Sequence, residues 1–172
     1  MIYFDEEKQA YNSQKTIQNW GKTCIFSCSD EMYDDFISGK YIWENNVLVL
    51  NPDYNNIKLN KAKEIKITEN DSARDTALNR GVVYKNVLFD SDTDQKANLT
   101  GAILQMNDTG TVEWFGMNND SLVCTKEDLL NIGGLITELH SFCWNKNAEI
   151  KTAINEAITT EQLEGVNIDY EV

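Results

Sequence analysis

The stretch TKEDLLNIGGLITELHSFCWNKNAEIKTAINEAI, residues 125–158, decides the fold because it is the longest regular segment of the chain. Apolar side chains recur along it in alternating steps of three and four: Leu129, Ile132, Ile136, Leu139, Cys143, Ile150, Ala153 and Ala157. This spacing predicts one long helix with a continuous buried stripe, interrupted only at Lys146. Four further apolar residues widen that face: Leu130, Leu135, Phe142 and Trp144. So wide a face favours packing under the chain's own hairpins, as the spine of a C-terminal domain.

Short polar sequences predict where helices begin, because Ser, Thr and Asp side chains can accept from the first free backbone N–H groups. The predicted starts are Ser29-Asp30, Asp92 with Gln95, Thr125 with Asp128, and Thr159 with Gln162. They open a short helix over 31–38, a second short helix after Gln95, the long helix, and a final helical turn.

Short apolar runs separated by turn residues predict strands. The expected hairpins join 41–43 to 47–50, 82–84 to 87–89, and the segments around Trp114 and Leu122. Single strands are expected within residues 1–12 and over 22–28, and the tail 166–172 is a further candidate.

The segment from Asn60 to Arg80 is rich in charge and poor in large apolar side chains. We predict an exposed or partner-facing helix there, broken near Asn70-Asp71 and ended by Gly81. The fold class is therefore α+β. A small β-rich module with one short helix (1–56) precedes a charged connecting helix (57–80) and a domain of short β-hairpins with the long helix (81–172).

Charge excludes one class of function and leaves another open. The 172 residues carry a formal charge of −13, whereas a general nucleic-acid binder or a protein bound to anionic membranes needs a basic face. No signal-peptide pattern opens the chain, and no apolar run approaches the roughly 20 residues that span a bilayer. We expect neither nucleic acid nor membrane as a partner.

A metal site would have to be built from the single histidine and the four cysteines. His140 and Cys143 share a helix face at i and i+3, and Cys24, Cys28 and Cys124 could complete a zinc set. The second close pair of a zinc signature is missing, and Cys143 lies on the apolar stripe. Core packing of reduced thiols is therefore the favoured interpretation.

Two other patterns are weaker than they look. Asp90, Asp92 and Asp94 match the first positions of a calcium loop, but Gln95 and Gly101 stand where that loop needs Gly and Glu. An acidic turn before a helix is the favoured interpretation. The four tryptophans, Trp20, Trp43, Trp114 and Trp144, could form a carbohydrate platform, but three of them lie in or beside apolar strand or helix segments, so core packing is favoured.

Nothing in the sequence supplies a nucleophile with a base. The only histidine lies inside the long helix, and Gly133-Gly134 lacks the Lys-Ser/Thr of a phosphate loop. That glycine pair costs helix stability and suggests a bend or the close approach of another backbone. We assign no catalytic, cofactor-binding or metal-binding residues and expect no cofactor and no enzymatic activity.

An ordered set of segments resembles an uncharacterised domain family of bacteriophage tail and tail-fibre proteins, over roughly 60% of the chain. The segments are Ala73-Arg74, residues 80–92 (RGVVYKNVLFDSD), residues 97–102 (ANLTGA), Trp114, residues 125–129 (TKEDL), and residues 153–158 (AINEAI) before Thr159-Thr160 and Leu163. Asn86 departs from a common Gly in the hairpin turn, but Asn also tolerates φ > 0. The N-terminal part, with Gly39-Lys40-Tyr41 and Asn51-Pro52-Asp53-Tyr54, is similar to the ends of small tail-fibre or fibre-assembly proteins.

The resemblance implies a non-enzymatic tail or tail-fibre-associated protein, either a structural component or a fibre-assembly factor. Its expected partners are other phage tail or fibre proteins and copies of itself, with a trimer as the expected homo-oligomer. It would be made in the host bacterial cytoplasm, with the virion tail as a further location. The alternative is an acidic phage-encoded inhibitor that binds a basic host protein, which one contiguous acidic face would favour.

Overall fold

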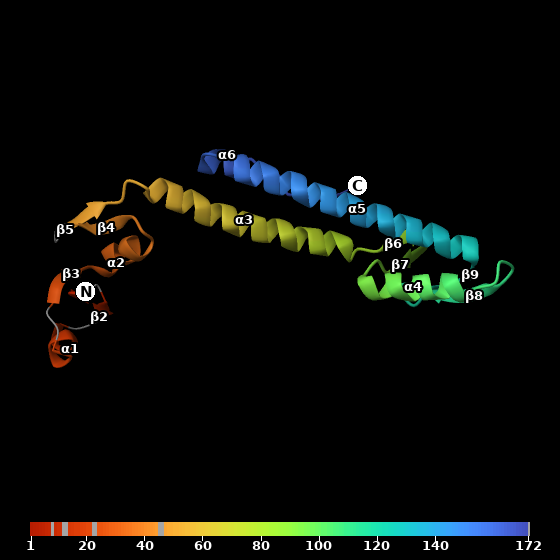
Figure 1. Cartoon of the computed structure of the whole chain (residues 1–172), viewed down its shortest axis with the longest axis horizontal. Coiled ribbons are helices and arrows are strands. Elements are labelled where there is room, and N and C mark those ends of the chain that lie inside the picture. The colour runs from red at the N-terminus through yellow and green to blue at the C-terminus, as the bar shows by residue number, and fades with distance from the viewer. Residues whose placement is uncertain (8, 12–13, 22–23, 45–46, 172) are drawn as a thin grey trace. The chain divides into compact units, whose positions relative to one another are not determined.

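The chain folds into two compact units, Met1–Lys61 and Ala62–Val172. The computed structural model describes residues 1–7, 9–11, 14–21, 24–44 and 47–171. Over these residues, helices α1 to α6 alternate with small antiparallel sheets (Figure 1). The predicted α+β class is confirmed.

The first unit is built on a small sheet of order β2-β1-β3. Strands β1 (Ile2–Asp5) and β3 (Cys24–Cys28) confirm the two strands expected near the N-terminus, although Lys22 and Thr23 lie outside the described residues. Strand β2 (Ala10–Tyr11) was not predicted. Phe4 is buried where its ring meets Phe36 edge-on at 5.2 Å. Helix α1 (Gln14–Asn19) was not predicted, because it is a single short turn with few apolar residues.

Helix α2 (Asp30–Ile37) and the hairpin β4–β5 complete this unit. Ser29 accepts from the Met32 N–H and caps α2, as predicted. Strand β4 (Tyr41–Glu44) pairs with β5 (Val47–Leu50), which confirms the first hairpin, while the turn residues 45 and 46 lie outside the described residues.

Helix α3 spans Tyr54–Leu78 without a break, so the predicted interruption near Asn70-Asp71 is wrong. The unit boundary falls inside this helix, after Lys61. The predicted connecting segment 57–80 is therefore not a separate part, because residues 62–78 pack within the second unit. There α3 runs antiparallel beside α5 (Figure 1).

Two hairpins and helix α4 cover the start of the long helix. Strands β6 (Val82–Tyr84) and β7 (Val87–Phe89) join through Lys85 and Asn86, both at positive φ, which confirms the predicted turn. Helix α4 (Thr93–Gln105) is capped by Asp92, and β8 (Thr111–Phe115) pairs with β9 (Ser121–Thr125). Gly81 takes φ +80° where an added Cβ would lie 2.5 Å from the Phe89 carbonyl oxygen, so only glycine fits between α3 and β6.

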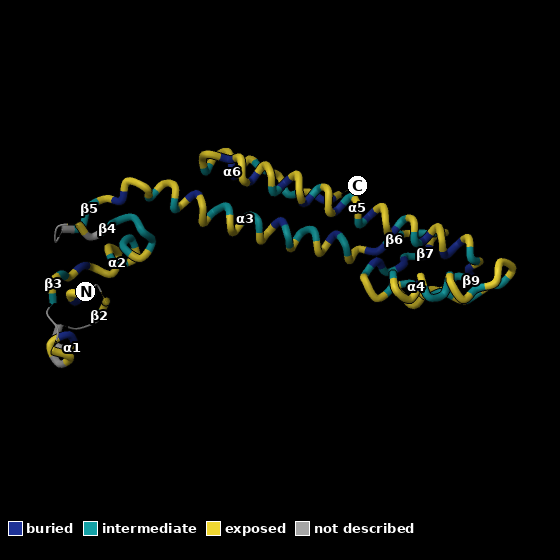
Figure 2. The backbone as a smooth tube through the Cα atoms, in the orientation of Figure 1, coloured by how far each residue is buried: buried dark blue, intermediate teal, exposed yellow. Residues whose placement is uncertain are grey.

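Helix α5 (Lys126–Glu156) is the predicted long helix, and Thr125 with Asp128 forms its capping box. Its buried residues recur along the whole length (Figure 2). Two details of the predicted stripe are wrong: the buried polar interruption is Asn147 rather than Lys146, and Ile154 is buried in place of Ala153. In both places the stripe could continue either three or four residues further along the helix. The structure buries the residue four positions further, which is Asn147 after Cys143 and Ile154 after Ile150.

Helix α6 (Thr160–Glu164), capped by Thr159, ends the regular structure. Residues 166–171 run back beside α5 and form no strand, so the strand proposed for the tail is wrong over these residues (Figure 1). Tyr170 is buried against α3 and α5 instead. The alternating apolar pattern of the tail therefore reflects packing in a groove between helices rather than pairing in a sheet.

Candidate interaction surface

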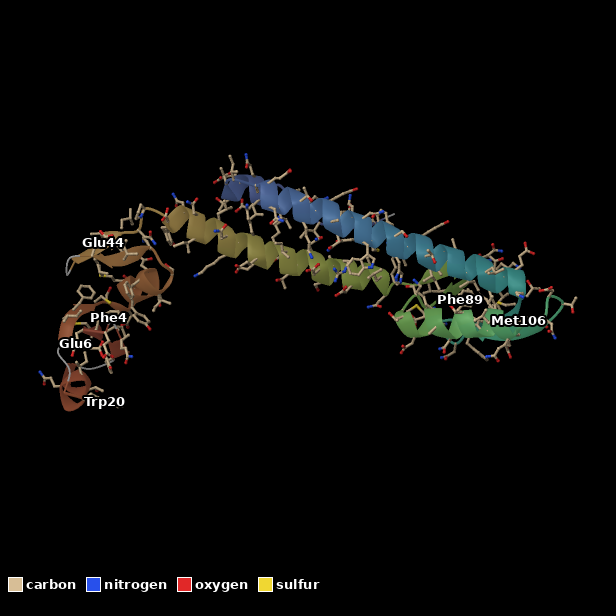
Figure 3. All side chains as sticks on the ribbon, viewed as in Figure 1. Phe4, Glu6, Trp20, Glu44, Phe89 and Met106 are labelled. Carbon is tan, nitrogen blue, oxygen red and sulfur yellow. The ribbon has the colours of Figure 1, made fainter. Side chains whose placement is uncertain are left out.

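The start of α5 is anchored in an apolar cluster. It contains Val87, Phe89, Leu99, Cys124, Leu129, Ile132 and Ile136. Phe89 is fully buried and lies between α4 and α5 (Figure 3). This cluster holds α4 and the hairpins on one side of α5 and leaves another side of the helix uncovered.

Two adjoining grooves lie on that uncovered side, and together they are called here the outer groove. One has a volume of about 320 Å³ and is lined by Arg80, Gly81, Val82, Val83, Leu135, Glu138, Leu139 and Phe142. The other, also about 320 Å³, is lined by Tyr84, Leu130, Asn131, Gly134, Leu135 and Glu138. Because Leu135 and Glu138 line both, the two grooves adjoin each other along α5.

The residues that widened the predicted apolar face are largely these groove residues. Val83 and Leu130 are 63% and 55% exposed, whereas Leu135 and Phe142 are half-buried. The expectation that Leu130 packs under the chain's own hairpins is therefore wrong. Periodicity detected the extra apolar width but could not say which part the hairpins would cover.

The two glycines inside α5 have different surroundings. A Cβ on Gly133 would lie 3.1 Å from Leu99 Cδ2, so this glycine allows α4 to approach closely. A Cβ on Gly134 would meet nothing within 4 Å, and Gly134 lines the outer groove. The close approach predicted for the glycine pair is made by α4 at Gly133. Nothing in the described part of the unit approaches Gly134 in this way.

Asp128 fixes one edge of the groove by tying the β6–β7 turn to the start of α5. Tyr84 Oη and Lys85 Nζ donate to its Oδ1 at 2.8 and 2.7 Å, and the Thr125 N–H donates to Oδ2 at 3.0 Å. The hydrogen bond from Lys85, then those from Thr125 and Tyr84, hold the pKa of Asp128 well below its usual range. Asn131 Nδ2 in turn donates to Tyr84 Oη at 3.3 Å.

A buried polar network holds α3 and the tail against the second half of α5. Tyr170 Oη donates to Asn70 Oδ1 at 2.8 Å and accepts from Asn147 Nδ2 at 3.3 Å. Asn70 Nδ2 donates to the Asn147 carbonyl oxygen at 3.3 Å. All three residues are at most 7% exposed, and burial raises the pKa of Tyr170. Sequence reasoning missed this network, although Asn147 stands four residues after Cys143 on the buried stripe.

Charged contacts surround this network at its rim. Asp71 Oδ1 receives Lys151 Nζ at 2.7 Å and Arg74 Nη1 at 2.9 Å, and the bond from Lys151 lowers the pKa of Asp71. The Arg74 guanidinium lies 4.3 Å from the centre of the Trp144 ring. The charged helix is therefore not simply exposed, because its polar side chains are what join it to α5.

The residues considered for a metal site take other places in the fold. His140 Nε2 donates to the Ser91 carbonyl oxygen at 2.7 Å, and Cys143 and Cys124 are fully buried in the second unit. Cys24 and Cys28 belong to the first unit. All four cysteines are free thiols, and burial raises the pKa of Cys28, Cys124 and Cys143. Among the described residues, no three His, Cys, Asp or Glu side chains meet where they could hold a metal ion.

The acidic turn caps a helix, whereas the tryptophans differ in their surroundings. Asp90 accepts from the Ser91 N–H and Asp92 caps α4 through the Gln95 N–H, while Asp94 lies in the first helical turn. Trp20 follows α1 in the first unit and is 72% exposed. Trp114 packs against the apolar cluster. Trp144 is 53% exposed on α5, with the Arg74 guanidinium over its ring, so the expectation that it packs in the core is wrong. The Trp43 side chain lies outside what the structure describes.

The second unit is thus an antiparallel helix pair whose one end is covered by short hairpins and a third helix. It corresponds to a family described as "Domain of unknown function (DUF4376)", whose model matches residues 61–172. Because this match covers more than half of the chain, the chain belongs to that family. No curated protein and no solved structure matches it. Within the described residues, no helix combines the length and apolar character needed to cross a membrane.

Proposed function

We propose that this chain is a non-enzymatic phage tail or tail-fibre-associated protein that acts through protein–protein contacts. The observation that carries the proposal is the outer groove, two adjoining hollows with apolar and polar side chains beside a helix that the rest of the unit already holds in place. Rigid placement of such a surface lowers the entropy cost of binding. The sequence resemblance to phage tail proteins supplies the biological setting.

In this proposal the partners are other tail or fibre proteins, and the chain acts as a structural component or as a fibre-assembly factor. Synthesis takes place in the host bacterial cytoplasm, and a structural component then remains in the virion tail. The proposed homo-oligomer, a trimer, adds contacts between copies. Light scattering on the purified chain measures the oligomeric state directly.

The test is to delete the gene and to probe purified particles with an antibody against the chain. A structural component is found in particles, whereas an assembly factor is absent from them and its deletion leaves particles with defective or missing fibres. Particles with normal tails and full infectivity after deletion would overturn the proposal.

One observation favours the alternative, an acidic inhibitor of a basic host protein. The second unit contains 19 Asp and Glu against nine Lys and Arg, a formal charge of −10 out of −13. Seven of its basic residues are engaged inside the unit: Lys63, Lys66, Arg74, Arg80, Lys85, Lys126 and Lys151. Binding of a basic nucleic-acid-binding host protein that weakens steeply with salt would support this alternative.

A further inference from the structure

The outer groove has an apolar floor and one acidic group at its middle. Leu135 lies at the junction of its two halves, and Val83 and Leu130 flank it as exposed apolar side chains. Glu138 lines both halves, and no hydrogen bond or ion pair joins its carboxylate to the part of the chain that the structure describes. A partner in this groove would therefore surround Glu138 with apolar contacts and desolvate its charge.

The basic residues near the groove are already engaged. Arg80 Nη1 donates to the Tyr170 carbonyl oxygen at 3.0 Å, and Lys85 is paired with Asp128 at 2.7 Å. A buried carboxylate left without a partner is costly, so the occupant has to bring its own cation.

Gly134 is the second, independent feature of the groove. Glycine inside a helix is less stable than alanine there, and a Cβ at this position has open space around it. Nothing inside the unit accounts for a glycine at this position. A missing side chain on the floor of a groove allows another backbone to approach closely.

We infer that the outer groove binds an amphipathic helix of another protein, with a Lys or Arg facing Glu138 between apolar side chains. The inference rests on the proposed function, that the chain acts through protein contacts, and names the surface and the chemistry of the partner. From Leu130 to Phe142 the groove follows α5 for roughly 18 Å, which suits a helix of about 12–16 residues.

A second copy of the chain, bound through a two-fold symmetric contact, is a poorer occupant than an amphipathic helix that brings a Lys or Arg. In a two-fold symmetric dimer a residue at the centre of the contact faces its own copy. Glu138 would then oppose the Glu138 of the partner in a chain whose formal charge is already −13. Like charges brought together at the centre of an interface oppose association.

The test selects binders from a displayed library of helical peptides of about 12–16 residues, the length set by the helical rise. The full chain is the bait, and the Val83→Asp and Leu130→Asp variants are used for counter-selection. The expected consensus is an apolar stripe with a central Lys or Arg. No enrichment over counter-selection, or a consensus with an acidic centre, would overturn the inference.

The selected peptide is then titrated against two matched pairs of variants. Glu138→Lys should weaken binding about tenfold or more, whereas Glu149→Lys, the same change at an exposed position of α5 outside the groove, should stay within about twofold. Gly134→Ala should weaken binding at least about fivefold while raising the melting temperature by about 2–4 °C. Gly101→Ala, in open space on α4, should raise the melting temperature alone.

If the Gly134→Ala and Gly101→Ala variants bind the peptide with equal affinity, Gly134 does not contribute to binding. The partner's backbone then does not approach α5 closely at Gly134. If light scattering shows that the wild-type chain is a dimer and that the Glu138→Lys variant is a monomer, the occupant of the groove is a second copy. That result would overturn the inference. If the wild-type chain binds a tail protein and the Glu138→Lys and Gly134→Ala variants bind it with the same affinity, the inference about this groove is refuted. The proposed function then still stands. If the groove binds the selected peptide but deletion of the gene leaves normal tails, the proposed function is refuted and the inference about the groove stands.

Discussion

The two halves of α5 are packed differently, although both bury apolar side chains. Its first half contributes Leu129, Ile132 and Ile136 to the apolar cluster beneath the hairpins. Its second half meets α3 and the tail through Asn147, which contacts Tyr170 and Asp71 and lies against Asn70. One continuous helix thus joins an apolar cluster to an interface in which a polar network lies among the buried Cys143, Ile150 and Ile154.

Each half of α5 supplies a different property to the unit. Apolar burial is non-directional and gives most of the stability, and in the first half the Asp128 hydrogen bonds and the close approach at Gly133 set the position of the helix. Hydrogen bonds between buried amides have fixed geometry, and a one-step shift would leave them unpaired, so the second half fixes the alignment of α3, α5 and the tail. The following predictions test this division, in order of decreasing effect.

Truncation in the apolar cluster should cause the largest loss. Phe89→Ala removes a fully buried ring and should lower the free energy of unfolding by about 3–5 kcal/mol. Leu104→Ala removes a side chain that is 80% exposed on α4 and should change it by less than about 0.5 kcal/mol. Urea titration of both variants measures the contrast, and equal losses would mean that the cluster is not the core.

Breaking the polar network should have an intermediate effect. Asn70→Ala leaves the buried Tyr170 hydroxyl without its acceptor at 2.8 Å and should cost about 1–3 kcal/mol. In a double-mutant cycle, Asn70→Ala combined with Tyr170→Phe should cost less than the sum of the single changes by at least about 0.5 kcal/mol, because the orphaned hydroxyl is then absent. Strict additivity would show that the three polar groups do not act as a unit.

Acid should weaken the first half through Asp128. Because folding lowers the pKa of Asp128, its stabilising contribution is complete above its unfolded pKa of about 4 and is lost as pH falls below that value. Asp128→Asn should cost about 1–2 kcal/mol at pH 6 and much less at pH 3.

Asp71 provides the comparison from the second half. Its pKa is also lowered, chiefly by Lys151, but its side chain is 34% exposed, so Asp71→Asn should cost less at pH 6. Urea titrations of both variants at the two pH values give the comparison. An Asp128→Asn penalty that does not shrink at pH 3 would assign the contribution of Asp128 to packing instead of charge.

The smallest effect is expected at the hairpin turn beside the first half. Lys85 and Asn86 lie at φ 48° and 66°, a pair of conformations that favours glycine at the second position. Asn86→Gly should stabilise the unit by roughly 0.5 kcal/mol without altering the Lys85–Asp128 contact. A loss of stability in thermal melts would show that the Asn86 side chain contributes a contact of its own.

Local signals in the sequence were reliable because the interactions they describe span only a few residues. The caps at Ser29, Asp92, Thr125 and Thr159 each accept from the backbone N–H three residues later. The hairpin turns followed from turn residues between apolar runs in the same way. These contacts need no knowledge of the rest of the fold.

The candidate surface could be predicted only in part. Periodicity identified Leu135 and Phe142 as apolar residues beyond the stripe, and the Gly133-Gly134 pair indicated a close approach. It could not show that α4 would cover Gly133 and leave Gly134 open. That outcome depends on where Leu99, more than 30 residues earlier in the chain, is placed by packing.

The sequence by itself determined a long capped helix, short hairpins, an acidic balance and an α+β class, since each follows from local chemistry or composition. Only the tertiary structure decided that the charged helix pairs with α5 through Asn70, Asn147 and Tyr170. The same folding step decided which side of α5 remains uncovered. The burial of an amide or the exposure of an apolar side chain depends on which other segments pack against it. Those segments are distant in the sequence.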